Sequence, residues 1–99
     1  MGEDKVEKIY REIFDVIDKG EYEKAIEILN VLFKDFPDHP VFLLLLSKCY
    51  IGLDKPINAL ITLKKCEAKE PSQEIELLNL LGATYEELFL DELAIQVAV

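Results

Sequence analysis

The feature that most constrains this chain is an internal repeat with a period of 34 to 35 residues. Three residue pairs lie 34 apart: Ala25 with Ala59, Leu29 with Leu63, and Pro37 with Pro71. After a slip of one residue, five further pairs lie 35 apart: Leu43 with Leu78, Leu46 with Leu81, Ser47 with Gly82, Tyr50 with Tyr85, and Ala59 with Ala94. Self-similarity at this period is typical of proteins built by stacking one supersecondary unit several times.

Apolar residues recur at spacings of three and four through most of the chain, which is the pattern of helices with one buried face. The expected helices are a first one that ends near Asp18, then residues 22–35, about 40–51, about 56–70, about 72–89, and a short sixth one from Asp91. The apolar run of residues 41–46 is the one candidate strand, and the proline before it and Tyr50 beyond it fit a helix better. We therefore expect an all-α protein in which each repeat unit is a pair of helices.

Four residues are expected to mark helix ends. Gly20 suits the left-handed conformation that closes many helices. Asp54, Ser72 and Asp91 have short polar side chains that can accept hydrogen bonds from the first N–H groups of a helix, so each is expected to cap the helix that follows it.

The repeated residues resemble the tetratricopeptide repeat family, whose pattern has a bulky residue, Leu-Gly and Tyr in the first helix, then Ala, a bulky residue and a closing Pro. The third unit reads Leu78-x-x-Leu81-Gly82-x-x-Tyr85, and the second reads Leu43-x-x-Leu46-Ser47-x-x-Tyr50, followed by Ala59, Leu63 and Pro71. The first unit matches in its second half, which runs from Gly20 to Ile26 and on to Leu29 and Pro37. It departs from the pattern in its first half, where Glu12-Ile13 replaces Leu-Gly and Val16 replaces Tyr.

This resemblance implies an α-solenoid of antiparallel helix pairs wound as a right-handed superhelix. The whole chain, residues 1–99, is then a single domain with repeat units at about 6–39, 40–74 and 75–99, the last one incomplete. A lone helix pair cannot bury its apolar face, and stacking the pairs creates one continuous core.

The charge is strongly negative and unevenly spread. The formal net charge is −9, and no Lys or Arg follows Lys69, whereas seven acids lie between Glu70 and Glu92. Such a field repels phosphate backbones and anionic membrane surfaces, so we expect neither nucleic acid nor a membrane as partner. A partner with basic character would be attracted, although the charge could also serve solubility alone.

The sequence predicts no catalytic residue, no metal site and no cofactor. His39 lies in a turn between Asp38 and Pro40, and an exposed loop histidine is the simpler interpretation than a general base. Cys49 and Cys66 lie on apolar helical stripes and are expected to be buried, which favours an intracellular, cytoplasmic protein. The longest apolar run, residues 41–46, is too short to cross a bilayer.

The resemblance implies a concave groove, lined by the first helices, that binds a peptide or a helix. These helices carry a second apolar stripe beyond the one needed for packing, and in the third unit the stripe becomes polar and acidic. The predicted groove residues are Tyr10, Phe14 and Ile17 in the first unit, Leu44, Lys48 and Ile51 in the second, and Asn79 and Glu86 in the third. The family's clamp for carboxylate tails of chaperones is not expected, since its places hold Tyr10, Phe14, Leu45, Glu76 and Leu80, none of them a cation.

We therefore expect a non-catalytic protein–protein interaction module whose ligand is apolar with basic residues. The alternatives are a self-associating structural module and a regulatory or docking fragment of a longer enzyme. Five apolar residues near the chain end cannot all be buried by so short a last helix: Leu88, Phe89, Leu93, Ile95 and Val97. This end predicts either a longer protein whose next repeat covers it or a homodimer through the C-terminal helix.

Overall fold

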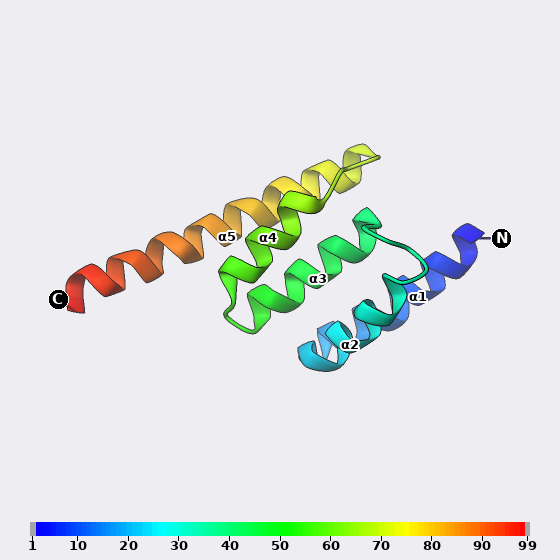
Figure 1. Ribbon diagram of the computed structural model, residues 1–99, viewed down its shortest axis with the longest axis horizontal. Coiled ribbons are helices and arrows are strands. Elements are labelled where there is room, and N and C mark those ends of the chain that lie inside the picture. Colours follow the sequence, from blue (N-terminus) through cyan, green and yellow to red (C-terminus); the bar gives the residue numbers. More distant parts are fainter. Residues whose placement is uncertain (1, 99) are drawn as a thin grey trace.

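The computed structural model describes the backbone of residues 2–98 and the side chains of residues 5–90. These residues form five helices and no strand: α1 (Gly2–Asp18), α2 (Tyr22–Leu32), α3 (Pro40–Gly52), α4 (Pro56–Lys65) and α5 (Pro71–Ala98). Successive helices run in alternating directions, so that α1 with α2 and α3 with α4 form two antiparallel pairs, and α5 lies beyond the second pair (Figure 1). The molecule is elongated, with extents of 55 × 27 × 21 Å. The expectation of an all-helical protein is confirmed.

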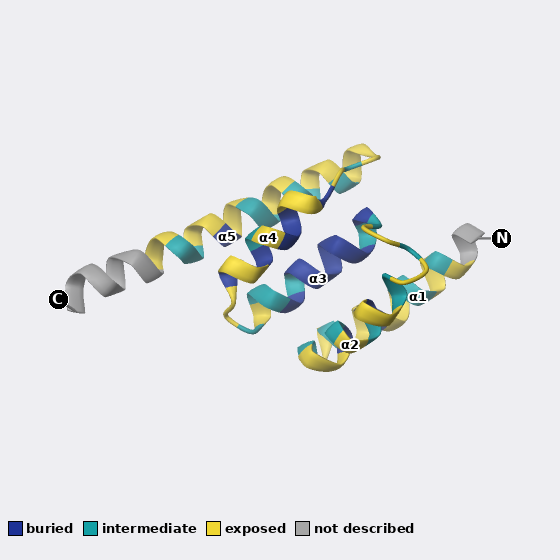
Figure 2. Ribbon diagram, viewed as in Figure 1, coloured by how far each residue is buried: buried dark blue, intermediate teal, exposed yellow. Residues whose placement is uncertain are grey.

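Helix α3 is the centre of the structure. Eight of its thirteen residues are buried, and it contacts each of α1, α2, α4 and α5 within the described part of the chain. Figure 2 shows α3 as the most continuously buried ribbon. A helix that is apolar on all sides is stable in water only when other elements surround it, and the sequence Val41-Phe42-Leu43-Leu44-Leu45-Leu46 leaves α3 no polar face along that stretch.

Two apolar clusters lie on different sides of α3. The first joins it to α1 and α2 through Ile13, Ala25, Leu29, Phe42, Leu45, Leu46 and Cys49. The second joins it to α4 through Leu43, Leu44, Leu63 and Cys66, and Leu77, Leu80 and Leu81 of α5 pack against it. Ala25 and Ala59 are fully buried, as expected for small residues where helices lie close together.

The same backbone turn closes α1 and α3, 34 residues apart. Gly20 takes a left-handed φ of 81° after α1, and Asp54 takes a φ of 59° after α3. In the first turn the N–H of Glu21 donates to the carbonyl of Val16 at 3.1 Å, and in the second the N–H of Lys55 donates to the carbonyl of Tyr50 at 2.8 Å. This is the Schellman end of a helix, in which a left-handed residue lets the chain reverse. Gly20 was predicted for this role.

Asp54 does not have the role predicted for it. The residue that precedes α4 is Lys55, with no side-chain capping hydrogen bond, because Asp54 itself supplies the left-handed turn that ends α3. Ser72 is not a cap either, because α5 already begins at Pro71. The second helix of each pair is also shorter than expected. Helix α2 ends at Leu32 and α4 ends at Lys65, and irregular chain follows each of them.

The predicted break before a sixth helix is wrong, because α5 continues from Pro71 to Ala98 without interruption. The residue 35 positions after Asp54 is Phe89, and a phenylalanine is strained in the left-handed conformation that the turn requires. No glycine, Asn or Asp stands at residues 87–90, so the chain has no residue there that can end a helix this way. The predicted apolar end at Leu93, Ile95 and Val97 and the repeat match at Ala94 fall on side chains outside the described residues.

The burial of Ala59 gives a test of the packing. We expect Ala59→Phe to lower the free energy of unfolding by about 1–3 kcal/mol, because the buried site beside α3 has no room for a ring. The matched control is Ala83→Phe, since Ala83 is an exposed alanine inside α5. Urea unfolding monitored by circular dichroism measures both, and equal stability of the two variants would contradict the packing described for Ala59.

Candidate functional site

A hollow with a volume of about 1190 Å³ lies between α1, α3 and α5 in the described part of the chain. We call it the groove. It is bounded by the first helix of each pair and by the beginning of α5, with the connections that lead into α3 and α5 at its ends. Its lining residues are Val6, Glu7 and Tyr10 of α1; Phe36, His39, Pro40, Val41, Leu44 and Leu45 around the start of α3; and Lys69, Glu70, Ser72, Gln73 and Glu76 around the start of α5.

The walls of the groove combine an apolar floor with polar edges. Val41, Leu44 and Leu45 of α3 supply apolar surface at the centre, and Tyr10 adds an aromatic ring from α1. Glu7, Glu70 and Glu76 supply carboxylates, of which Glu7 is paired with Arg11 at 3.3 Å and Glu76 with Lys48, and Lys69 adds a cation at the same edge as Glu70. Binding sites for peptides and small molecules have this composition, in which apolar surface provides affinity and a few polar groups fix orientation.

One lysine connects the three helices beside the groove. The Lys48 ammonium lies 5.8 Å from the centre of the Phe14 ring on α1 and forms an ion pair with Glu76 on α5. The Phe14 ring in turn stacks on Tyr10, with ring centres 6.0 Å apart. An ammonium over an aromatic face is attracted by the ring quadrupole, and here the same charge also neutralises a carboxylate. Lys48 therefore contacts both neighbouring first helices, α1 and α5, beside the groove.

The structure brings together four of the eight predicted groove residues. Tyr10 and Leu44 line the groove, and Phe14 and Lys48 lie directly beside it. Leu44 is almost fully buried and belongs to the apolar cluster with Leu63, so most of its side chain serves packing.

The other four predicted residues lie farther along the helices. Ile17 is half-buried and packs against the cluster around Ile13, and Ile51 is half-buried near the end of α3. Asn79 is exposed and lines a shallow hollow on α5 with Ile75 and Glu76, while Glu86 is exposed.

Sequence reasoning missed the two ends of the groove. Val6 and Glu7 lie one turn before Tyr10 on α1, and the helical spacing from Tyr10 could have indicated them. The connection into α5 could not be placed from a periodic pattern, because it is irregular chain. There the backbone N–H of Lys69 donates to the Gln73 side chain at 2.7 Å, and this bond links the connection to the first turn of α5.

His39 has a structural role at the start of α3. Its Nδ1 accepts a hydrogen bond from the backbone N–H of Val41 at 3.2 Å, which caps the helix. Its ring contacts Phe36 and Phe42, with ring centres 6.2 and 5.0 Å away. Burial lowers the pKa of His39 below its ordinary value of 6.5, because the charged imidazolium loses hydration there.

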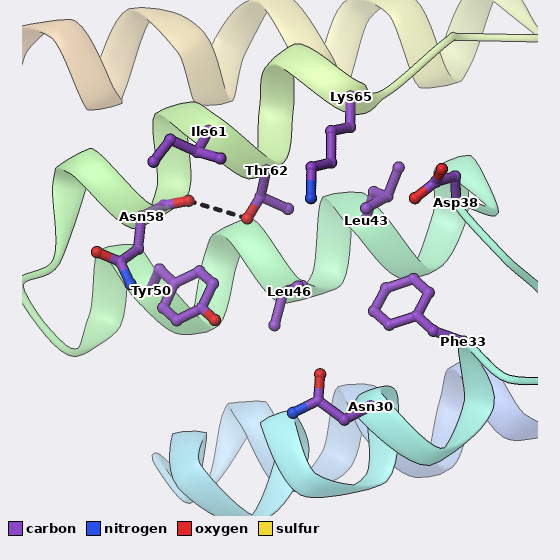
Figure 3. A pocket seen from close by; sticks show the side chains of 10 residues that line it. All are labelled: Asn30, Phe33, Asp38, Leu43, Leu46, Tyr50, Asn58, Ile61, Thr62 and Lys65. Carbon is purple, nitrogen blue, oxygen red and sulfur yellow. Dashed lines mark hydrogen bonds between the residues drawn. The ribbon is translucent and has the colours of Figure 1, made fainter.

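A second, smaller cavity of about 400 Å³ lies on the other side of α3, between α2 and α4 (Figure 3). Leu43, Leu46 and Tyr50 of α3 form its base, and Asn58, Ile61, Thr62 and Lys65 of α4 form one wall. The Thr62 hydroxyl is already occupied, since it donates to the carbonyl of Asn58 at 2.9 Å. The cavity is about one third the volume of the groove, and we regard it as the gap between two second helices.

The two thiols belong to the core. Burial raises the pKa of Cys49 to about 11 and also raises that of Cys66, so both remain protonated at neutral pH. The Cys66 thiol donates weakly to the carbonyl of Pro40 at 3.8 Å, which ties the end of α4 to the start of α3.

No cluster of three or more His, Cys, Asp or Glu side chains in the described part is arranged to hold a metal ion. Within the same part, no helix combines the length and apolar character needed to cross a membrane.

Comparison with known proteins adds no relative. No protein-family model matches the chain, and neither a curated protein nor a solved structure matches it significantly.

Protonation of His39 should weaken the fold. Because the pKa of His39 is lower in the folded state than in the unfolded chain, the unfolded state binds the proton first as pH falls. We therefore expect the free energy of unfolding to decrease as pH drops below about 6.5 and to level off below the folded-state pKa. Thermal melts between about pH 7 and pH 5, above the range where most carboxyl groups titrate, measure this.

The control for this prediction is His39→Asn, because asparagine can cap α3 without titrating in this range. The variant should lose the His39 part of the pH dependence. If the stability of the variant and that of the parent protein decrease equally with falling pH, the effect does not come from His39.

Proposed function

We propose that this chain is a protein-interaction module of the tetratricopeptide type, an α-solenoid that binds a peptide or a helix in its groove. Two features support the solenoid arrangement. The same left-handed turn closes α1 and α3 at Gly20 and Asp54, 34 residues apart. Helix α3 contacts both neighbouring first helices, α1 and α5, as well as both second helices, which is the contact pattern of stacked helix pairs.

The observation that carries the functional proposal is the groove of about 1190 Å³ between the first helices, with an apolar floor and carboxylates at its edges. A ligand that fits it has an apolar anchor that can reach Tyr10 and Val41 and a basic group that can approach Glu70. The net charge of −9 would accelerate its association. The groove offers no group with raised reactivity, so binding rather than catalysis is the proposed role. The free, buried thiols are consistent with a cytoplasmic location.

The test is to select peptides from a displayed random library on the wild-type protein. We expect the enriched peptides to combine aromatic or aliphatic anchors with Lys or Arg. Tyr10→Ala should weaken the binding of the tightest peptide by about tenfold or more, because the substitution removes the aromatic wall of the groove. Raising NaCl from about 0.05 M to about 0.5 M should weaken it further by screening the carboxylates.

The matched control is Ile61→Ala, which removes an exposed apolar side chain that lines the second cavity. Its affinity for the selected peptide should stay within about twofold of the wild-type value, since an uninvolved contact contributes little. The proposal fails if Tyr10→Ala binds as tightly as wild type, or if salt leaves the affinity unchanged.

A further inference from the structure

Helix α5 carries an apolar stripe that nothing in the described structure covers. Its residues are Ile75, Leu78, Tyr85 and Phe89, all more than half exposed, with Gly82 among them. Their spacings of three and four place them on one face of the helix. At Gly82 no atom lies within 4 Å of the position where a side chain would begin, so the middle of the stripe is open to close approach. We call these five residues the α5 stripe; it lies on a different face from Leu77, Leu80 and Leu81, which pack toward α3 and α4.

The chain contains a covered copy of the same stripe. The residues 35 positions earlier are Leu43, Ser47 and Tyr50 on α3, and helix α4 packs against α3 there. Leu43 is 3% exposed, whereas Leu78 is 61% exposed; Ser47 is fully buried, whereas Gly82 is exposed. The middle of the stripe, Leu78, Gly82 and Tyr85, therefore has a counterpart on α3, whereas Ile75 and Phe89 correspond to Pro40 and Asp54. The helix that packs against α3 beside this counterpart is α4, which presents the buried residues Ala59, Thr62 and Leu63.

Charge indicates which kind of helix can bind the α5 stripe. Helix α4, which packs against the corresponding face of α3, contains no acid and carries Lys64 and Lys65 in its last turn. The α5 stripe lies on a helix that contains no base, with Glu74 directly before Ile75 and Glu86 directly after Tyr85 in the sequence. A second copy of α5 would place these acids against acids of the same kind. The chain's own residues 91–98 carry two more acids and no base, and they continue α5 instead of folding back on it.

We propose that the α5 stripe is a second interaction surface, distinct from the groove, and that it binds a basic amphipathic helix of another protein. This helix resembles α4: a small residue packs opposite Gly82, a Leu follows about one turn later, and Lys or Arg residues flank the apolar face. The spacing of the stripe suits two helices that cross at a shallow angle, the arrangement of most helix bundles. The flanking cations would lie near Glu74 and Glu86.

The probe for this proposal is a synthetic peptide with the sequence of residues 54–69, held helical by a staple on its outward face and labelled with a fluorophore. Fluorescence anisotropy should show saturable binding to the full chain that weakens as salt is raised. Leu78→Glu should weaken binding at least tenfold, because it places a carboxylate in the apolar contact. A peptide with Lys64 and Lys65 replaced by Glu should bind at least tenfold more weakly than the parent peptide.

Two variants of the protein serve as controls. Val31→Glu introduces the same charge at an equally exposed valine on α2, outside both surfaces, and should leave the affinity unchanged. Tyr10→Ala damages the groove but should also leave the affinity for this peptide unchanged, which separates this proposal from the one for the groove. If Leu78→Glu and Val31→Glu weaken peptide binding equally, the effect comes from the net charge of the protein and the proposal is wrong.

Light scattering over a concentration series tests whether a second copy of the chain covers the α5 stripe instead. We expect a monomer for the wild-type chain at all concentrations that the peptide experiment uses. A dimer that Leu78→Glu converts to a monomer would show that a second copy covers the stripe, and the proposal of a foreign basic helix would then be wrong.

Discussion

The structure depends on the burial of α3. Its central stretch carries six consecutive apolar residues, and such a helix has no side that can face water without cost. Burying a single leucine side chain contributes about 1.5–3 kcal/mol, so surrounding α3 dominates the energetics of this small domain. The result is that α1 and α2 pack on one part of its circumference and α4 and α5 on another.

The groove is a consequence of this arrangement. Helices α1 and α5 both pack against α3 and leave a hollow between them. Its floor is formed by side chains of α3, chiefly Val41, Leu44 and Leu45. Lys48 then connects the walls, because its ammonium reaches the Phe14 ring on one side and Glu76 on the other. Partly exposed ion pairs of this kind contribute little to stability, so the packing on α3 and not this contact holds the two walls in place.

Much of the fold could be predicted from the sequence, because the signals involved were local. Helical periodicity placed the first four helices and the start of the fifth, although it predicted a break near Asp91, and the turn at Gly20 followed from the need for a left-handed residue. The errors arose where one residue could serve two roles. Asp54 was predicted to cap α4, yet it forms the left-handed turn after α3. The expected break near Asp91 failed because the turn needs a residue that tolerates left-handed geometry, and Phe89 does not.

The candidate site was predictable only in part, for a physical reason. On a helix that is buried all round, the sequence cannot distinguish a residue that faces a groove from one that faces a neighbouring helix, and Leu44 does both. Lys69 and Glu70 reach the groove from an irregular connection that no periodicity describes, whereas Ser72, Gln73 and Glu76 lie on α5 itself. Tyr10 and Phe14 were found because α1 has a polar side against which a surplus apolar stripe is visible.

The most direct test of the central claim is to map the binding surface by NMR, following backbone amide shifts while a selected peptide is titrated into the labelled protein. We predict that the largest changes fall on Val6, Tyr10, Val41 and Gln73, which lie on three different helices and all line the groove. Changes concentrated instead on Asn58, Ile61 and Lys65 would place the ligand in the second cavity and contradict the account.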